Sequence, residues 1–479
     1  MVKVLMASSE AAPFAKTGGL GDVAGSLPKY IIKNDVDIRV IMPLYKTIPQ
    51  SLKKNIFYKT NFFVNLGWRR QHCGIYECIY NGVRFYFIDN EYYFGRDRIY
   101  GYMDDSECFA YFCRAVLEAL PYLDFIPDII HCNDWQTGMI PVLLKAKYCS
   151  IGLYKKIHTL FTIHNLKYQG IFPKSILGDI LELGDEYFTY DKLEFYGSVS
   201  FMKGALVYSD IINTVSPTYA YEIQYPYMGE RLDGLLNARK KDLYGILNGL
   251  DYDEYNPETD KNIFANYDEN NIAGKTADKL KLQEYSGLDV SADKPVIGIV
   301  SRLAYSKGLD LVINVFERLM DLDVQLVVLG VGDEAYEDFF KGASLKYKGK
   351  VSANIVFDNA LAHKIYAGSD MFLMPSYFEP CGLGQIIALR YGSIPIVRET
   401  GGLVDTVLSY NEFTNEGNGF SFTNFNADDM LYTIKRALGF YHEKKIWNEI
   451  MRRAMGCDFS WDKSASIYVE LYNKLISFN

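Results

Sequence analysis

Short, continuously apolar segments recur along the chain and alternate with stretches whose apolar residues have helical spacing. A continuously apolar run is typical of a strand buried on both faces, and such strands separated by helices form parallel sheets. The alternation therefore predicts an α/β protein. The predicted strands are Val2–Ala7, Ile38–Met42, Arg84–Ile88, Asp128–Cys132, Thr159–Ile163 and Ile211–Val215, followed by Val296–Ser301, Gln325–Leu329, Asn354–Phe357, Met371–Met374 and Ile394–Val397.

The predicted strands form two series, one in each half of the chain. Predicted helices fill the gaps, such as Ser106–Leu120 in the first series and Leu309–Met320 in the second. This pattern indicates two Rossmann-like domains, which a chain of 479 residues can accommodate. We expect the break within residues 237–250, where a charged stretch passes into a turn-rich one. Two such domains facing each other would form a cleft lined by the carboxyl ends of their strands, where ligands bind in open α/β sheets.

The composition argues against several kinds of partner and site. Its 50 basic and 59 acidic side chains give a net charge of −9, which disfavours a nucleic-acid or anionic-membrane surface. Eight cysteines without a CxxC pair argue against a disulfide framework or zinc site and favour a reducing compartment. Neither a signal-peptide pattern nor an apolar run of about 20 residues is present, so the expected location is the cytoplasm.

Aromatic residues make up 15% of the chain and include 39 tyrosines. Aromatic rings fill protein cores, but each ring is apolar on its face and polar at its rim, which also suits stacking against sugars. Composition by itself favours core packing.

A glycine-rich segment, AKTGGLGD, follows the first predicted strand and precedes a predicted helix. Gly18 and Gly19 let the backbone approach a ligand, the start of the helix offers free N–H groups to an anion, and Lys16 adds a positive charge. The spacing matches neither GxGxxG nor a P-loop. A tight turn with a surface lysine is the alternative.

Two segments in the second half also follow predicted strands. SRLAYSKGLD places Arg302 and Lys307 in one loop, where two cations would suit a diphosphate, and a solvated loop with a salt bridge is the alternative. PSYFEPCGLGQ places Glu379 in an apolar loop, which is costly unless the carboxylate is paired or used. A glutamate that caps a helix is the alternative there, and the thiol of Cys381 is best interpreted as packing.

Three further segments, HCNDWQTG, TIHNLKYQG and ETGGLVDTV, also follow predicted strands. They place Asp134, His164 and Glu399 at strand ends, although each residue alone is more often a cap or a core group. A carboxylate at Glu399 could receive ribose hydroxyls. Together the strand ends predict a cleft in which Lys16, Arg302 and Lys307 bind a diphosphate. Polar side chains would surround the group attached to that diphosphate.

In this order, the segments KTGGLGDV, SRLAYSKGLD, PSYFEPCGLGQ and ETGGLVDTV closely resemble the bacterial glycogen synthase and plant starch synthase family. The resemblance extends from Met1 to about Tyr472. It implies the GT-B fold, in which two Rossmann-like domains face each other and the last helix crosses back to the first domain. Residues 1–240 would form the acceptor side, residues 241–460 the nucleotide-sugar donor side, and residues 461–479 the crossover helix.

The resemblance also implies a reaction. The family transfers glucose from a nucleotide sugar, in bacteria usually ADP-glucose, to the non-reducing end of an α-1,4-glucan, with retention of configuration and without a metal or other cofactor. ADP-glucose and a glucan or malto-oligosaccharide are therefore the expected partners, and nucleic acid and membranes are not. The choice between ADP- and UDP-glucose, the acceptor length, the oligomeric state, regulation and the route to retention stay open.

Site residues follow from the same resemblance. Lys16 and the Gly18–Gly19 backbone would approach the distal phosphate or the sugar. Arg302 and Lys307 would neutralise the departing diphosphate, and Glu379 would stabilise an oxocarbenium-like transition state. The other implied contacts are His164 near the 6-hydroxyl, counted with the catalytic groups, Asn165, Asn248, the backbone of Cys381, Gly382 and Leu383, Asp134 in the cleft wall, and Phe357 on the adenine.

Phe357 and Gly384 depart from the family pattern, which often has Tyr and Thr at these positions. Three other classes of function remain as alternatives. The first is a glucan-binding protein without activity. The second is a Rossmann oxidoreductase, which the spacing of the first turn disfavours. The third is a nucleotide-sugar transferase that acts on a lipid or a small acceptor.

Overall fold

The computed structural model describes residues 1–477, and its contacts divide the chain into two compact units. The first unit comprises Met1–Gly249 and the C-terminal segment from Trp461, and the second comprises Leu250–Ser460. The division lies within the predicted 237–250 interval but after the predicted boundary at residue 240. Residues beyond 240 belong to the first unit because strand β12 (Leu243–Gly245) pairs with β11 (Ile211–Thr214) in its sheet.

The first unit is built on a nine-stranded sheet with the order β12-β11-β7-β6-β1-β2-β5-β4-β3. Its strands are parallel from β12 to β5, and β3 and β4 form an antiparallel hairpin at one edge. The remaining bounds are β1 (Val2–Ala7), β2 (Val36–Pro43), β3 (Phe57–Leu66), β4 (Arg69–Tyr80), β5 (Val83–Asp89), β6 (Ile129–Asn133) and β7 (His158–Ile163). The parallel part agrees with the sequence prediction.

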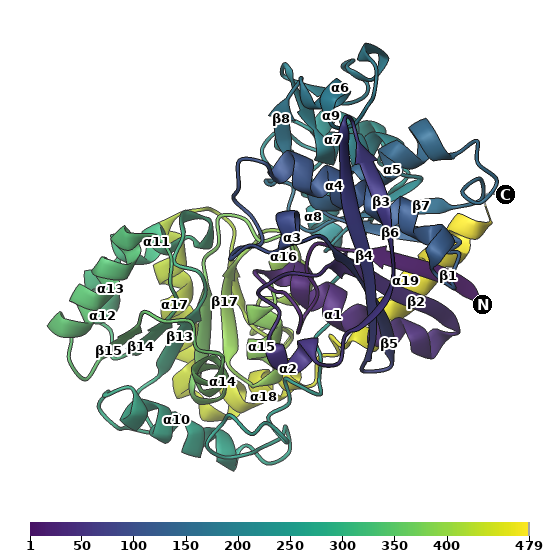
Figure 1. Cartoon of the computed structure of the whole chain (residues 1–479). Helices are drawn as coiled ribbons and strands as arrows, with labels where there is room; N and C mark the ends of the chain where they lie inside the picture. Colours follow the sequence, from purple (N-terminus) through teal and green to yellow (C-terminus); the bar gives the residue numbers. More distant parts are fainter. Residues whose placement is uncertain (478–479) are drawn as a thin grey trace. The chain divides into compact units, whose positions relative to one another are not determined.

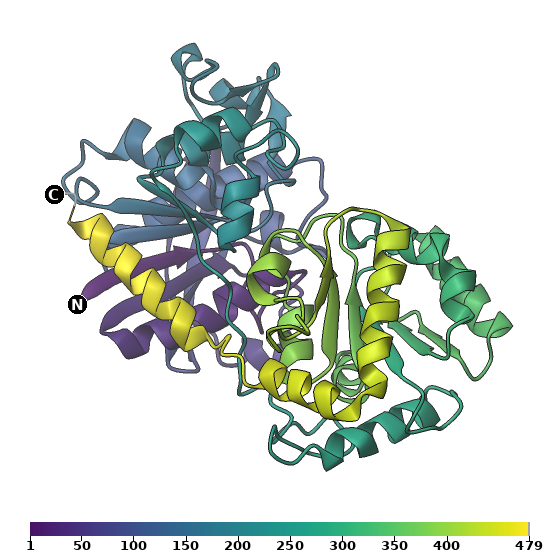
Figure 2. The ribbon, with the colours of Figure 1, turned by 180° about the vertical axis from the view of Figure 1, so that it is seen from behind.

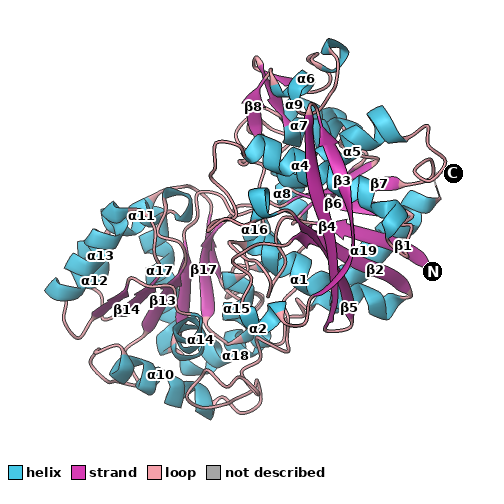
Figure 3. Cartoon of the chain, viewed as in Figure 1, coloured by secondary structure: helices cyan, strands magenta, loops and turns pink. Residues whose placement is uncertain are grey.

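Helices cover this sheet, and a small second sheet, ordered β8-β10-β9, lies in the same unit (Figure 3). Its strands are β8 (Ile171–Pro173), β9 (Glu194–Phe195) and β10 (Ser198–Ser200). The helices are α1 (Gly19–Ile31), α2 (Gln50–Lys53), α3 (Glu91–Phe94), α4 (Asp105–Ala119), α5 (Met139–Leu143), α6 (Ile176–Asp179), α7 (Phe201–Tyr208), α8 (Pro217–Glu222), α9 (Asp233–Ala238) and α19 (Trp461–Ile476).

Helix α19 returns to the first unit, as predicted for the C-terminal segment, and packs beside α1 (Figure 2). Its buried tyrosines also bond to the sheet. The Tyr472 hydroxyl is 2.8 Å from Nδ1 of His131, and the Tyr468 hydroxyl accepts from Nδ2 of Asn213 at 3.0 Å. The last helix of the chain is therefore part of the core of the first unit.

The second unit contains a six-stranded, all-parallel sheet with the order β15-β14-β13-β16-β17-β18 (Figure 1). Its strands are β13 (Val296–Val300), β14 (Gln325–Leu329), β15 (Val351–Asn354), β16 (Met371–Met374), β17 (Ile394–Arg398) and β18 (Phe420–Phe422). Its helices are α10 (Ala273–Tyr285), α11 (Leu309–Asn314), α12 (Phe316–Met320), α13 (Glu334–Lys346), α14 (Asn359–Gly368), α15 (Gly384–Arg390), α16 (Gly402–Thr406), α17 (Ala427–His442) and α18 (Lys444–Met455).

Two local predictions in this unit differ from the structure. The strand predicted at Asn354–Phe357 lies earlier, at β15, because Val351 is the residue that enters the core. The helix predicted at Leu309–Met320 is divided into α11 and α12 at Val315, whose φ of −107° and ψ of 13° leave the helical region. No helix within residues 1–477 combines the length and the apolar character that a membrane span needs.

Candidate functional site

In the first unit, the turn after β1 carries Lys16 and leads into α1, whose N-cap is Gly18. The Lys16 ammonium lies 2.6 Å from Oδ1 of Asp22, in the first turn of that helix. Burial is the largest influence on Asp22 and raises the pKa of its carboxyl group. Lys16 is exposed, so a ligand at the turn can reach its charge.

Packing within the protein does not require glycine at positions 18 and 19. A β-carbon at either position would meet no protein atom within 4 Å, whereas one at Gly25 would collide with Ala12. Gly18 is also extended, with φ of −162° and ψ of −164°, which any residue can adopt. Open space above two exposed glycines fits the close approach of a ligand.

Glu10, which was not predicted from the sequence as a site residue, holds this turn. Its buried carboxylate accepts hydrogen bonds from the backbone and the hydroxyl of Thr17, the latter at 2.7 Å, and from the hydroxyl of Tyr100 at 2.6 Å. Its position shortly after the first predicted strand was the signal that could have found it. Its role is to position the backbone between Lys16 and Gly18.

Asp134 lies beyond the end of β6 with a φ of 56°, and its carboxylate accepts the backbone N–H of His164 at 2.8 Å. Burial raises the pKa of Asp134 to about 7. This bond joins the loops that follow β6 and β7, which are neighbouring strands in the sheet. Asp134 therefore positions the His164 loop.

His164 is a buried, neutral hydrogen-bonding group. Its Nε2 lies 2.9 Å from Oδ1 of Asn133, whose Nδ2 donates to the Ala7 carbonyl at 3.1 Å. Because the amide nitrogen of Asn133 is used in that way, its oxygen faces His164 and Nε2 carries the proton. Burial lowers the pKa of His164 to about 3, so the ring stays neutral and Nδ1 can accept a hydroxyl hydrogen.

Two asparagines complete the predicted set in this unit. Asn165 lies next to His164, and its Oδ1 accepts the Lys167 N–H at 3.1 Å. Asn248 lies beyond β12 and is buried, and its Oδ1 has no hydrogen-bond partner within residues 1–477. A buried amide oxygen without a partner is costly, and a ligand hydroxyl would satisfy it.

In the second unit, Lys307 and Glu379 come together. Lys307 ends a 3₁₀ turn (Tyr305–Lys307) after β13, Glu379 follows β16, and these two strands are neighbours. The Lys307 ammonium is 2.6 Å from Oε2 of Glu379, which also accepts the Ser376 hydroxyl at 3.2 Å. Arg302 lies exposed in the same loop as Lys307, and no carboxylate among the described residues forms an ion pair with it.

The backbone after Glu379 presents its N–H groups away from a buried glutamine. Gln385 donates from Nε2 to the carbonyls of Cys381 at 3.0 Å and Gly382 at 2.9 Å. Because C=O and N–H point in opposite directions across a trans peptide, the N–H groups of Gly382 and Leu383 face away from Gln385. Two donors there can meet ligand hydroxyls or an anion. The Cys381 thiol is buried, as predicted.

The ETGGLVDTV segment supports the loop of Glu379 from the neighbouring strand β17. A β-carbon at Gly401 would collide with the Glu379 carbonyl oxygen, and Gly401 has a φ of 46°. Glu399 accepts hydrogen bonds from the hydroxyls of Ser421 at 2.7 Å and Thr423 at 2.8 Å, so both of its oxygens already have partners. Phe357 lies in the loop after β15 and is 84% exposed, which leaves its ring free to stack.

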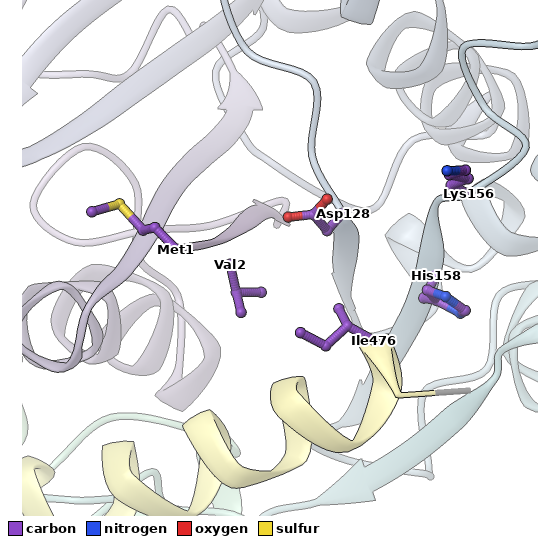
Figure 4. A pocket seen from close by; sticks show the side chains of 6 residues that line it. All are labelled: Met1, Val2, Asp128, Lys156, His158 and Ile476. Atoms are coloured by element: carbon purple, nitrogen blue, oxygen red, sulfur yellow. The ribbon is translucent and has the colours of Figure 1, made fainter. Parts of the chain in front are cut away.

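The first unit also contains a cavity of about 350 Å³, which lies away from the candidate site residues described above (Figure 4). It opens at the amino ends of β1, β6 and β7, the opposite edge of the sheet from the residues above. Its lining residues are Met1, Val2, Asp128, Lys156, His158 and Ile476. Ligands of open α/β sheets bind at the carboxyl edge, so this cavity is not the candidate site.

Comparison with known proteins assigns the chain to a family. Residues 3–238 match the model of the starch synthase catalytic domain, and residues 286–452 match that of glycosyl transferases group 1. Glycogen synthase of Desulforamulus reducens is 57% identical over 99% of both chains, and that of Geobacillus stearothermophilus is 58% identical over 99% of this chain and 98% of its own. The chain belongs to the glycogen and starch synthase family.

Similarity to solved structures supports the same family assignment. The catalytic domain of starch synthase IV from Arabidopsis thaliana, bound to ADP and acarbose, is 35% identical and superposes with a TM-score of 0.92 over 99% of both chains. Sucrose-phosphate synthase from Thermosynechococcus elongatus, at 15% identity and a TM-score of 0.64, shares the fold. The predicted two-domain glycosyltransferase fold is confirmed. As a family member, the synthase is a glucosyltransferase that elongates a glucan.

Proposed function

We propose that this synthase transfers glucose from ADP-glucose to the non-reducing end of an α-1,4-glucan, with retention and without a metal ion. The observation that carries the proposal is the Lys307–Glu379 pair at adjacent strand ends of the second unit. The starch synthase IV structure, whose ligands are ADP and acarbose, supports the choice of an adenine nucleotide.

Lys307 and Arg302 would stabilise the leaving group. When the bond between the glucosyl carbon and the diphosphate breaks, negative charge develops on the departing ADP, and fixed cations stabilise it better than mobile water. Glu379 would bind glucose hydroxyls and favour positive charge at the sugar ring. Its bond to Lys307 places both charges within 2.6 Å before the substrate arrives. The N–H groups of Gly382 and Leu383 would bind the 3- and 4-hydroxyls, and Phe357 would stack on the adenine.

The first unit would contribute Lys16 and the Gly18–Gly19 backbone at the distal phosphate or the sugar. His164 would accept the 6-hydroxyl hydrogen through Nδ1, because burial keeps its ring neutral. Asn248 would satisfy its unpartnered oxygen with a sugar hydroxyl. Asn165 would add a further contact.

The test is transfer from donors labelled in the glucosyl group to glycogen. We expect label in the polymer from ADP-glucose, less from UDP-glucose, and no loss of rate in EDTA. Faster transfer from UDP-glucose would overturn the donor assignment, and loss of rate in EDTA would overturn metal independence. Glycogen binding without transfer from either donor would instead favour a glucan-binding protein without activity.

A further inference from the structure

Three tyrosines form an exposed row in and just after helix α8. The helix is labelled in Figure 1. Tyr221, Tyr225 and Tyr227 are 58%, 37% and 60% exposed. The ring centroids of Tyr221 and Tyr225 are 4.9 Å apart, and those of Tyr225 and Tyr227 are 6.2 Å apart with an interplanar angle of 25°. We name these three residues the tyrosine row. Core packing does not account for them, because their rings are open to solvent.

The backbone holds the tyrosine row in place. The Tyr225 carbonyl accepts the N–H groups of Met228 at 3.2 Å and Gly229 at 2.8 Å. A ring row that is already ordered loses little conformational entropy when a ligand covers it.

Two hydrogen bonds connect this segment to the loop that carries His164 and Asn165. The Tyr219 hydroxyl accepts the Leu166 N–H at 3.1 Å, and Nε2 of Gln169 donates to the Glu230 carbonyl at 2.9 Å. The two loops follow β7 and β11, which are adjacent parallel strands. The tyrosine row therefore continues the surface of the candidate site within the first unit.

We propose that the tyrosine row is an outer binding surface for the glucan acceptor, on which successive glucosyl units stack. The inference rests on the proposed function, which supplies the polymer. Tyrosine offers an apolar face to the sugar ring and a hydroxyl to the sugar oxygens. The row itself carries no charged side chain, which suits a neutral polymer better than an ionic partner. A long glucan held there keeps its end near the His164 loop, whereas a short oligosaccharide does not need this surface.

The experiment uses the full chain with all three tyrosines replaced by serine, Y221S/Y225S/Y227S, and Tyr432→Ser as the control. Tyr432 is 71% exposed in the second unit and lies outside both candidate surfaces. Glycogen binding is measured by gel retardation without donor, and KM and kcat are measured with glycogen and with maltotriose. For the triple variant we expect weaker retardation and a glycogen KM raised about tenfold, with kcat unchanged on maltotriose. The control should behave as wild type.

Unchanged glycogen retardation in the triple variant would overturn the inference while leaving transfer intact. A wild-type chain that transfers glucose to maltotriose but shows no glycogen retardation would also overturn it. If the triple variant changes the oligomeric state in solution instead of glycogen affinity, the tyrosine row is a contact between copies of the chain and the inference is wrong. If the wild type transfers glucose to no acceptor, that result counts against the proposed function. The retardation assay is run without donor, so it tests the tyrosine row separately.

Discussion

At the scale of single residues, the contact between Lys307 and Glu379 gives the most specific prediction about the reaction. Replacing Glu379 by Gln keeps the size of the side chain and removes its charge. We expect kcat to fall on the order of 10²–10³-fold, because a charge aligned with the transition state is lost. Steady-state kinetics with saturating donor measure this effect.

Glu399→Gln is the matched control, since Glu399 is an exposed carboxylate one strand away that bonds to hydroxyl groups. Its kcat should stay near that of the wild type. A comparable loss in both variants would show that general negative charge, not Glu379, supports turnover.

Asp134 gives a pH-dependent prediction. Burial raises its pKa to about 7 in the folded chain, against about 3.9 for an unperturbed aspartate. Between these values the folded state binds more protons than the unfolded state, so the contribution of Asp134 to stability falls as pH rises from about 4 to about 7. Asp134→Asn keeps an oxygen for the His164 N–H and cannot ionise. It should therefore raise the melting temperature more at pH 8 than at pH 5, and equal shifts at both values would refute the prediction.

At the scale of structural elements, two glycine turns that look alike in sequence have different roles. A β-carbon at Gly18 enters open space, whereas one at Gly401 meets the Glu379 carbonyl. Gly18→Ala should change the melting temperature little and raise the KM for the donor. The extended backbone at Gly18 admits alanine, and the lower entropy of the unfolded chain offsets the loss of a glycine N-cap. Gly401→Ala should lower both the melting temperature and kcat. Thermal unfolding and donor kinetics of the two variants give the comparison, and a destabilised Gly18→Ala would contradict it.

The sequence predicted most of the parallel strands because they are largely apolar on both faces. It missed the three-residue edge strands β12 and β18. It also missed the hairpin of β3 and β4, whose burial alternates along the strand because one face meets solvent. From the segments after the strands, Lys307 and Glu379 were predicted to lie at the carboxyl edge of one sheet, and Asp134 and His164 at that of the other. The specific contact within each pair was not predicted. Their distances depend on loop conformation, which no local pattern fixes. Glu10 was missed because its partners, Thr17 and Tyr100, are brought together only by the fold.

At the scale of the whole molecule, the two units differ in how the chain builds them. The second unit is one continuous stretch with its own buried core. The first unit needs α19, whose Trp461, Tyr468 and Leu475 are buried in it.

We expect residues 250–460 expressed alone to unfold cooperatively, since their sheet and core are complete. A chain ending at Ser460 should be aggregation-prone, because the apolar face that α19 covers becomes exposed. Calorimetry of the first fragment and limited proteolysis of the second test these outcomes. A protease-resistant first unit in the chain without α19 would contradict the second expectation.

The discontinuity of the first unit has a consequence during translation. Protein domains usually fold in the order in which they leave the ribosome. Here the stretch after Gly249 can finish folding first, while the earlier-made part of the nascent chain lacks the helix that closes it until α19 emerges. Binding sites formed by the amino-terminal half therefore mature last, although their codons are read first.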